Sequence, residues 1–336
     1  MGQINRDDMT AAGAADPGWS HYWAQGHLHS CPTTFSGFYG PQTQALWQRF
    51  ASRLGPADRV LELGCGNGAL LRFLAGQFEV GTEPTLIGVD AAQLNPTGQV
   101  GDEGAGATPR FTLHSETAFD ALEPTAEFTG LISQFAFEYG ATESAWDAVE
   151  GAIAPQCSLC WVLHKQGSRL QRVAQDECVV LRTLLEPQGV LERAAQMLPL
   201  LLQAATPAGR QALNSSPAAV ATRSHYNAAV AGLMEQARAL THGGYAEESL
   251  QQISVLLGSV PQMGRARAET ELQQLRSGLV AHLARLDALC ASALDAQAIE
   301  QYRARLERLG FRSITVSTLS EQGEEMGWVL EGLREQ

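Results

Sequence analysis

Short apolar runs alternate with amphipathic segments through the middle of the chain. Five runs have the length of strands, at residues 59–63, 85–90, 110–114, 130–135 and 158–164. Helical patterns and glycine turns separate these runs. Alternation of this kind predicts an α/β domain with a parallel sheet.

The pattern is almost wholly helical between residues 166 and 309. Leucines from Leu272 to Leu289 recur at intervals of three and four, which predicts a stripe that packs against other helices. One helix over 265–309 would be about 65 Å long at 1.5 Å per residue, so we expect a break near Asp295. Five prolines are expected to divide the remainder into shorter helices: Pro187, Pro199, Pro207, Pro217 and Pro261.

The end of the sequence returns to strand character after one more helix. Residues 298–309 have an amphipathic pattern, with Asp295 as the expected N-cap and Gly310 as the stop. Strand-like alternation follows at 311–318 and at 325–330. The chain therefore divides into three predicted regions: an N-terminal lid or cap segment (1–55), a sheet domain (56–165 and 298–336) and a helical insertion (166–297).

Composition and charge exclude several classes of protein. The 336 residues are 45% hydrophobic and 18% charged, which is a globular composition. A net charge of −13 disfavours nucleic acid as a partner. No apolar run nears the roughly 20 residues that span a bilayer, and the first residues lack the apolar core of a secretory signal. We therefore expect a cytoplasmic protein with no nucleic-acid partner and no membrane partner.

The six cysteines predict neither a disulfide framework nor a zinc site. A long chain without a secretory signal is not a small disulfide-bonded scaffold. Cys157 and Cys160 fall inside a strand-like run, where residues three apart point to opposite faces, and the sequence has no second pair of this spacing. We interpret both as core residues.

A glycine-rich loop directly after the first strand is the strongest functional signal. Its sequence, ELGCGNG at residues 62–68, stands between a strand and a helix. Glycines at alternate positions let the backbone turn sharply and approach a ligand, with amide groups free to donate. The spacing is tighter than the Gly-x-Gly-x-x-Gly of dinucleotide-binding folds. Asp90 ends the second strand, where its carboxylate can accept hydrogen bonds from both hydroxyls of a ribose.

As a set, the glycine loop, the strand that ends in Asp90, the alternating units and the helix before a terminal hairpin resemble the class I S-adenosylmethionine-dependent methyltransferases. The resemblance covers residues 56–165 and 298–331. It implies S-adenosylmethionine as cofactor and a Rossmann-like seven-stranded sheet with an antiparallel last strand. The large all-helical insertion then falls between strand five and the last sheet helix. The alternative is a Rossmann-like fold that binds another nucleotide or none.

The resemblance also implies where the cofactor contacts lie. Glu62 would stand near the methionine amino group, Asp90 on the ribose hydroxyls, and Ser115 near the adenine amino group. The predicted cofactor-binding residues are Glu62, Gly64, Cys65, Gly66, Asn67, Asp90, Ala91, Ser115, Glu116, Ser133 and Gln134.

Residues that follow the fourth and fifth strands are the candidate catalytic groups. Glu138 and Tyr139 follow the fourth strand, and His164 ends the fifth. His164 is a candidate general base with an expected pKa of about 6–7, and a strand-end histidine held only by hydrogen bonds is the alternative. Quinone-type O-methyltransferases can carry Glu-x-x-Glu-His in this stretch. Phe135 and Tyr139 replace two of those positions here, so we expect no metal.

Residues 19–31 are dense in aromatic side chains and histidines. Our leading interpretation is a lid over cofactor and substrate, and the second is packing against the helical region. A third interpretation is a metal site, because His27, His29 and Cys31 would share a face of an extended chain.

Three functions are compatible with these residues. The leading hypothesis is a methyltransferase whose small-molecule acceptor is enclosed between the sheet rim, the N-terminal segment and the helical insertion. The alternative is a protein methyltransferase whose helical region docks the partner. The third is a non-catalytic protein that forms a homodimer through its leucine-striped helices. The residues leave open whether oxygen, nitrogen, sulfur or carbon accepts the methyl group.

Overall fold

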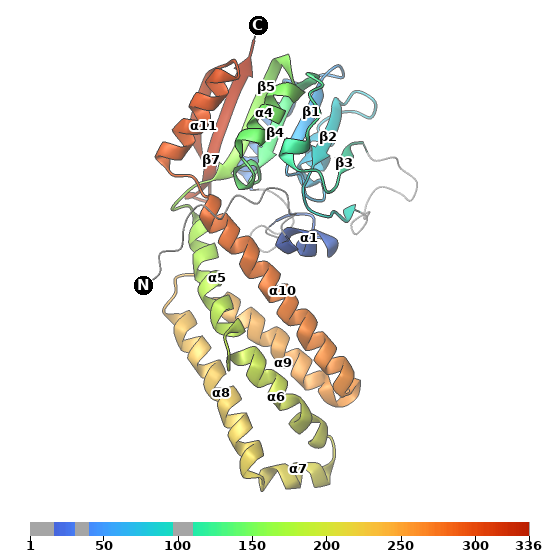
Figure 1. Cartoon of the computed structure of the whole chain (residues 1–336), viewed down its shortest axis with the longest axis vertical. Helices are drawn as coiled ribbons and strands as arrows, with labels where there is room; N and C mark the ends of the chain where they lie inside the picture. Colours follow the sequence, from blue (N-terminus) through green and yellow to red (C-terminus); the bar gives the residue numbers. More distant parts are fainter. Residues whose placement is uncertain (1–16, 31–39, 97–109, 336) are drawn as a thin grey trace. The chain divides into compact units, whose positions relative to one another are not determined.

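The structure, a computed structural model, describes residues 17–30, 40–96 and 110–335 (Figure 1). The chain divides into two compact units. The sheet unit comprises Met1–Ser168 and Ser292–Gln336, and the helical unit comprises Arg169–Ala291. The helical unit is therefore an insertion in the sequence of the sheet unit.

One seven-stranded sheet, in the order β3-β2-β1-β4-β5-β7-β6, forms the centre of the sheet unit. The first five strands run parallel, and β7 runs antiparallel to both of its neighbours, β5 and β6. The strands are β1 (Arg59–Leu63), β2 (Thr85–Val89), β3 (Thr112–His114), β4 (Phe128–Gln134), β5 (Ile153–His164), β6 (Phe311–Glu321) and β7 (Glu324–Arg334). The predicted Rossmann-like α/β sheet with an antiparallel last strand is confirmed.

Helices cover both faces of this sheet. Leu61 and Leu63 of β1 belong to a buried cluster with apolar side chains of α4 and α11, whereas Phe50 of α2 packs on the other face beside Val60. Cys157 and Cys160 are buried in β5. The helices of this unit are α1 (Pro17–Ala24), α2 (Pro41–Ala51), α3 (Ala69–Ala75), η3 (Phe119–Ala121), η4 (Phe137–Tyr139), α4 (Glu143–Ala152) and α11 (Ala296–Arg308).

The helix before the terminal hairpin begins and ends as its sequence predicts. Asp295 Oδ1 accepts a hydrogen bond from the Ala298 amide at 2.7 Å, which satisfies a free donor of the first turn of α11. Gly310, with a φ of +91°, follows the helix. The preceding helix ends at Ser292, so the expected break near Asp295 is confirmed.

Every helix or strand that the structure shows in the helical unit is a helix, as predicted for the insertion. They are α5 (Arg169–Leu185), α6 (Val190–Gln203), α7 (Pro207–Asn214), α8 (Pro217–Arg238), α9 (Tyr245–Met263) and α10 (Arg265–Ser292). The predicted leucine stripe of α10 packs against the core of this unit, where Leu272 and Leu279 are buried.

Two of the five prolines do not separate helices. Pro187 lies between α5 and α6, and Pro207 and Pro217 begin α7 and α8, where a missing amide donor costs nothing. Pro199 and Pro261 instead lie inside α6 and α9, so the prediction was wrong for them. A helix continues past a proline where packing offsets the lost hydrogen bond, and the residues before both prolines are buried.

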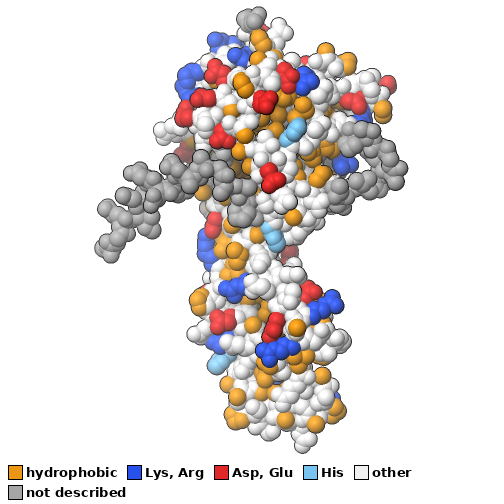
Figure 2. Space-filling model, turned by 45° about the vertical axis from the view of Figure 1, so that its right-hand side comes forward, with side chains coloured by type: hydrophobic (Ala, Val, Ile, Leu, Met, Phe, Trp, Pro, Cys, Tyr) orange, Lys and Arg blue, Asp and Glu red, His pale blue; other side chains and the backbone are white. Residues whose placement is uncertain are grey.

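Among the residues that the structure describes, no helix is both long and apolar enough to cross a membrane. On the face shown in Figure 2, acidic and basic side chains are interspersed over both units. The negative net charge is therefore not gathered into a single patch on that face.

Candidate functional site

The glycine loop connects β1 to α3 and is tied to the end of β2. The amides of Gly64 and Cys65 both donate to the Val89 carbonyl, at 2.9 and 3.1 Å. Gly64 and Gly66 have φ values of +72° and +49°, which side chains rarely allow. A Cβ atom at Gly64 would also lie 2.1 Å from the Cβ of Ala136. Glycine at this position is therefore required by conformation and by space.

Asp90 connects the loop to the chain that follows β2. Its Oδ2 atom accepts a hydrogen bond from the Gly66 amide at 2.8 Å, and its Oδ1 atom accepts one from the Ala92 amide at 2.9 Å. Burial raises the pKa of Asp90, and these two hydrogen bonds oppose the rise. The structure thus brings two predicted cofactor residues, Gly66 and Asp90, into contact.

Glu62 is a buried carboxyl group beside this pair. It is 3% exposed, and among the described residues its Oε2 atom has no hydrogen-bond partner. Burial and the negative charge of Asp90 raise the pKa of Glu62 well above its usual range. A buried carboxylate oxygen without a donor is unfavourable, so this position favours a ligand that brings a cationic or N–H group.

Helix α1 covers the glycine loop. A Cβ atom at Gly66 would lie 2.5 Å from the ring of Trp23, so this ring rests on the glycine. Asn67 holds the helix in place, because its Nδ2 atom donates to the carbonyls of Trp23 and His27 at 3.1 and 2.7 Å. Asn67 was predicted to contact the cofactor, and in this structure it contacts α1. Sequence reasoning found the aromatic density of this segment but not the docking of Trp23 on Gly66.

Ser115 and Glu116 lie beside the segment that follows Asp90. The Ser115 hydroxyl donates to the Ala92 carbonyl at 3.2 Å and accepts from the Leu94 amide at 3.0 Å. Glu116, with a φ of +54°, also donates its amide to the Ala92 carbonyl. These predicted residues therefore lie next to the segment that contains Ala91 and Ala92, and contact of any of them with the cofactor stays a prediction.

Ser133 and Gln134 at the end of β4 make contacts within the protein. Ser133 is fully buried; its hydroxyl donates to the Leu63 carbonyl at 3.0 Å and accepts from the Phe137 amide at 3.1 Å. Gln134 Oε1 accepts a hydrogen bond from the indole of Trp47 in α2 at 2.5 Å. Both residues support the rim of the site in this structure, and cofactor contact by either remains a prediction.

Glu138 and His164 lie together at the ends of β4 and β5. Glu138 Oε1 accepts a hydrogen bond from the His164 backbone amide at 2.6 Å. Among the described residues, Glu138 Oε2 and His164 Nδ1 are buried without hydrogen-bond partners. Burial raises the pKa of Glu138 to about 7 and lowers the pKa of His164 to about 3. The expected pKa of 6–7 for His164 is wrong, because burial disfavours the charged form of the imidazole.

Two aromatic rings hold the imidazole of His164. The ring of Phe135 stacks on it with centroids 4.7 Å apart, and Tyr139 meets it edge-on at 5.6 Å. Phe135 has a φ of +55°, a conformation that costs free energy for a bulky side chain and that concentrates at functional sites. Gly327 of β7 makes room for this ring, because a Cβ atom there would lie 2.7 Å from Phe135 Cε1. A glycine inside a strand was the one sequence signal for this contact.

Metal ligands do not gather in the part of the chain that the structure describes: no group of three histidine, cysteine or acidic side chains could hold an ion there. His27 stacks on Tyr22 with ring centroids 4.4 Å apart, and its Nε2 atom lies 3.2 Å from Gln25 Oε1. Cys31, the third member of the proposed metal set, lies outside the described residues.

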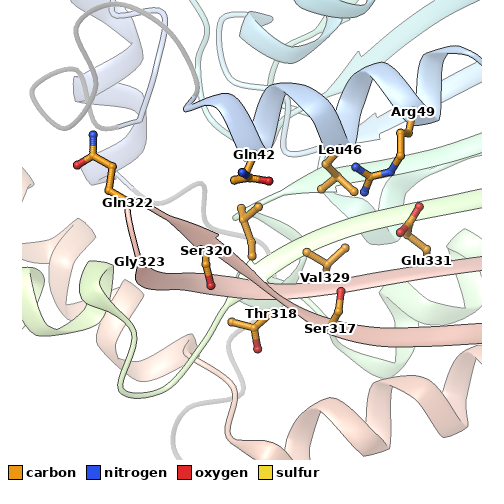
Figure 3. Close-up of a pocket in the computed structure, with 11 residues that line it drawn as sticks. Gln42, Leu46, Arg49, Ser317, Thr318, Ser320, Gln322, Gly323, Val329 and Glu331 are labelled. Atoms are coloured by element: carbon orange, nitrogen blue, oxygen red, sulfur yellow. The ribbon is translucent and has the colours of Figure 1, made fainter.

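A hollow of about 360 Å³ lies between α2 and the β6–β7 hairpin (Figure 3). Arg49 of α2 and Glu331 of β7 extend toward each other across it, and Leu46 and Val329 form part of its apolar wall. None of the site residues predicted from the sequence lines this hollow. It is therefore separate from the glycine-loop site.

Comparisons with known proteins give little evidence about the fold beyond what the sheet topology already shows. No protein-family model and no curated protein matches the chain. Among solved structures, the CurJ carbon methyltransferase is 11% identical, with 94% of this chain and 60% of that chain covered and a TM-score of 0.43. An S-adenosylmethionine-dependent methyltransferase from Mesorhizobium loti is 20% identical, with 36% and 53% covered and a TM-score of 0.27. A possible exported protein from Bordetella parapertussis is 13% identical, with 96% and 80% covered and a TM-score of 0.40.

The chain spans between 53% and 62% of the length of the first three solved structures that it matches. At these identities and TM-scores, the strand order alone carries the fold assignment. Five parallel strands in the order 3-2-1-4-5, followed by an antiparallel β7 inserted beside β5, form the sheet of the class I S-adenosylmethionine-dependent methyltransferases. The chain has that fold.

Proposed function

We propose that this protein is a methyltransferase that uses S-adenosylmethionine and acts on a small-molecule acceptor. The observation that carries the proposal is the arrangement of Asp90, Gly66 and Glu62 at the ends of β1 and β2. In this arrangement a buried carboxyl oxygen needs a donor, and the ammonium group of the methionine moiety would supply one. The residues present therefore fit the cofactor.

The remaining cofactor contacts follow from the neighbouring segments. Asp90 would accept the ribose hydroxyls, Ala91 would flank the adenine, and Ser115 and Glu116 would stand near its amino group. Gly64 would let the backbone approach the methionine moiety. When bound, the sulfonium of the cofactor supplies an activated methyl group, so the protein's own tasks are alignment, exclusion of water and proton transfer.

Proton transfer would fall to Glu138. A carboxyl group with a pKa of about 7 gains or loses a proton near neutral pH, which suits a general base. His164 would remain neutral, and because its low pKa makes the imidazole a weak base, its role toward the acceptor would be to accept a hydrogen bond. Phe135 and Tyr139 would orient that imidazole and contribute apolar surface to the acceptor site.

The N-terminal segment would act as the lid of this site. Helix α1 rests on Gly66 through Trp23, and Trp19 meets the ring of Tyr139 edge-on with centroids 6.0 Å apart. One short helix thus contacts both the predicted cofactor loop and a predicted acceptor residue, which supports an enclosed small-molecule site. We assign to the helical insertion the role of a substrate cover or of a dimerisation surface.

Calorimetry with S-adenosylhomocysteine tests the cofactor assignment. The Asp90→Ala variant is expected to lose about 1.5–3 kcal/mol of binding free energy, or about 10- to 150-fold in affinity, because charge-assisted hydrogen bonds are lost. Asp147→Ala is the matched control, since Asp147 is an exposed aspartate of α4. No binding of NAD is expected. Equal affinity of wild type and Asp90→Ala would exclude the proposed site.

A second measurement distinguishes the two classes of acceptor. The purified protein is incubated with S-adenosylmethionine labelled in its methyl group and with a cell extract divided into metabolites and proteins. Label in the metabolite fraction supports the small-molecule acceptor. Label confined to the protein fraction would favour the protein methyltransferase instead.

A further inference from the structure

Helices α5 and α10 of the helical unit lie side by side and share polar contacts (Figure 1). The Gln171 side chain of α5 donates to the Cys290 carbonyl of α10 at 3.2 Å. Arg182 of α5 forms an ion pair with Asp287 of α10. These contacts fix the two helices to each other around a pair of cysteines, Cys178 and Cys290.

The two thiol groups are in contact. Cys178 is 3% exposed, and its Sγ atom donates to Asp287 Oδ1 at 3.4 Å. The side chains of Cys178 and Cys290 are also hydrogen-bonded to each other. Cys290 is partly exposed, so small molecules in solution can reach one member of the pair.

The surroundings give the two thiols different chemistry. The hydrogen bond to Cys290, burial and the charge of Asp287 raise the pKa of Cys178, so this thiol keeps its proton. The hydrogen bond from Cys178 lowers the pKa of Cys290, with help from the positive charge of Arg182. The more exposed cysteine is therefore the better nucleophile, and the buried one is placed to react second.

We propose that Cys178 and Cys290 are a redox modification site, which hydrogen peroxide converts into an intramolecular disulfide between α5 and α10. The Cys290 thiolate attacks one oxygen of the peroxide, the O–O bond breaks, and Cys290 becomes a sulfenic acid while hydroxide leaves. The Cys178 sulfur then attacks the sulfenic sulfur, and its proton and the departing hydroxide form water. Two thiols are oxidised by two electrons in total, and one peroxide is reduced to two waters.

The cross-link would join the two helices through which the chain enters and leaves the helical unit. Residues 178–290 would then form one covalent loop that contains most of this unit. A covalent loop of this length lowers the conformational entropy of the unfolded chain. Oxidation is therefore expected to stabilise the helical unit and not the sheet unit. The proposal concerns this unit alone and does not depend on the methyltransferase assignment.

Peptide mapping tests the proposal on the full chain. The protein is treated with a small excess of hydrogen peroxide, the remaining thiols are blocked, and trypsin is added without reductant. Cleavage yields peptides 173–182 and 286–303, each with one cysteine. We expect one linked species of these two peptides, lighter than their sum by two hydrogens and separated again by reductant. Oxidised protein without this species would overturn the proposal.

Variants separate this chemistry from general oxidation. In Cys178→Ser, the link is expected to vanish and Cys290 is expected to accumulate as a sulfenic acid that dimedone captures. Cys157→Ala is the matched control, because Cys157 is buried in the sheet unit, and it is expected to form the link as the wild type does. Alkylation of Cys290 by iodoacetamide is expected to be at least about tenfold faster than that of Cys157. Equal alkylation rates, or a link that persists without Cys178, would contradict the assignment.

Discussion

Replacing Glu138 by glutamine is expected to stabilise the sheet unit at pH 8 and to have little effect at pH 5. Glutamine keeps the shape and the oxygen that accepts the His164 amide, but it never becomes charged. Burial raises the pKa of Glu138 from its ordinary 4.5 to about 7. A group whose pKa is higher in the folded state stabilises the fold below its unfolded pKa. That contribution is lost as the pH rises through the folded pKa.

The magnitude follows from the two pKa values. At 1.36 kcal/mol per pKa unit, ionising Glu138 in its buried position costs about 3 kcal/mol once the pH exceeds 7. At pH 5 the same relation gives less than about 1 kcal/mol, because most of the folded protein still carries the proton. The stability difference between Glu138→Gln and wild type is therefore expected to grow by about 2–3 kcal/mol from pH 5 to pH 8.

Tryptophan fluorescence can follow this difference during urea denaturation. All six tryptophans belong to the sheet unit, so the signal reports its unfolding without a contribution from the helical unit. Glu150→Gln is the matched control, since Glu150 is exposed on α4, and its stability difference from wild type is expected to stay constant with pH. The pH-dependent contributions of other buried carboxyl groups to the free energy of unfolding cancel in this difference, because variant and wild type are both measured at each pH. A Glu138→Gln difference that does not change between pH 5 and pH 8 would refute the reasoning.

Three further outcomes are expected. Asp295→Ala is expected to destabilise the sheet unit by about 1 kcal/mol through loss of its N-cap hydrogen bond, measured by the same fluorescence; a variant as stable as wild type would contradict the capping role. Phe135→Gly is expected to raise the pKa of His164 from about 3 toward its ordinary 6.5, because the stacked ring no longer shields the imidazole from water. NMR titration of the imidazole measures the pKa of His164, and Phe135→Tyr is the control that keeps the ring. An unchanged pKa in Phe135→Gly would show that the Phe135 ring does not lower the pKa of His164. Trp23→Ala is expected to speed association and dissociation of S-adenosylhomocysteine at least about threefold in stopped-flow experiments, because α1 then holds Gly66 less firmly. Unchanged rates would mean that the helix does not gate the loop.

The sequence predicted the bounds of a strand well where residues adjacent in the sequence determine where the strand ends. β1 has the bounds that its apolar run predicts, because the glycine loop ends it abruptly. β5 is different: it begins at Ile153, whereas the sequence predicted Ser158. Pro155 lies in the added part and reads as a strand breaker, but the pairing with β4 is irregular there, and an irregularity is where a sheet accepts proline.

The site was predictable only in part, for a related reason. The meeting of Gly66 with Asp90 follows from the order of strands β1 and β2, which the alternating pattern implies. The docking of Trp23 on Gly66 depends on a segment with weak periodicity, so no local signal places it. The low pKa of His164 depends on its burial beside two aromatic rings, which is a tertiary property. The residue types alone indicated that Glu138 and His164 could take part in catalysis. Their pKa values depend on how deeply the fold buries them.

The position of β7 imposes an order on the synthesis of this protein. β7 fills the place between β5 and β6, and its partners on β5 run from Cys157 to His164. A ribosome therefore completes the whole helical insertion before it makes the strand that covers the β5 edge. Until then, an apolar strand presents unpaired amide and carbonyl groups, which is the surface on which chains associate wrongly. A chaperone that binds apolar strands would have its natural target at β5, during the interval set by the length of the insertion.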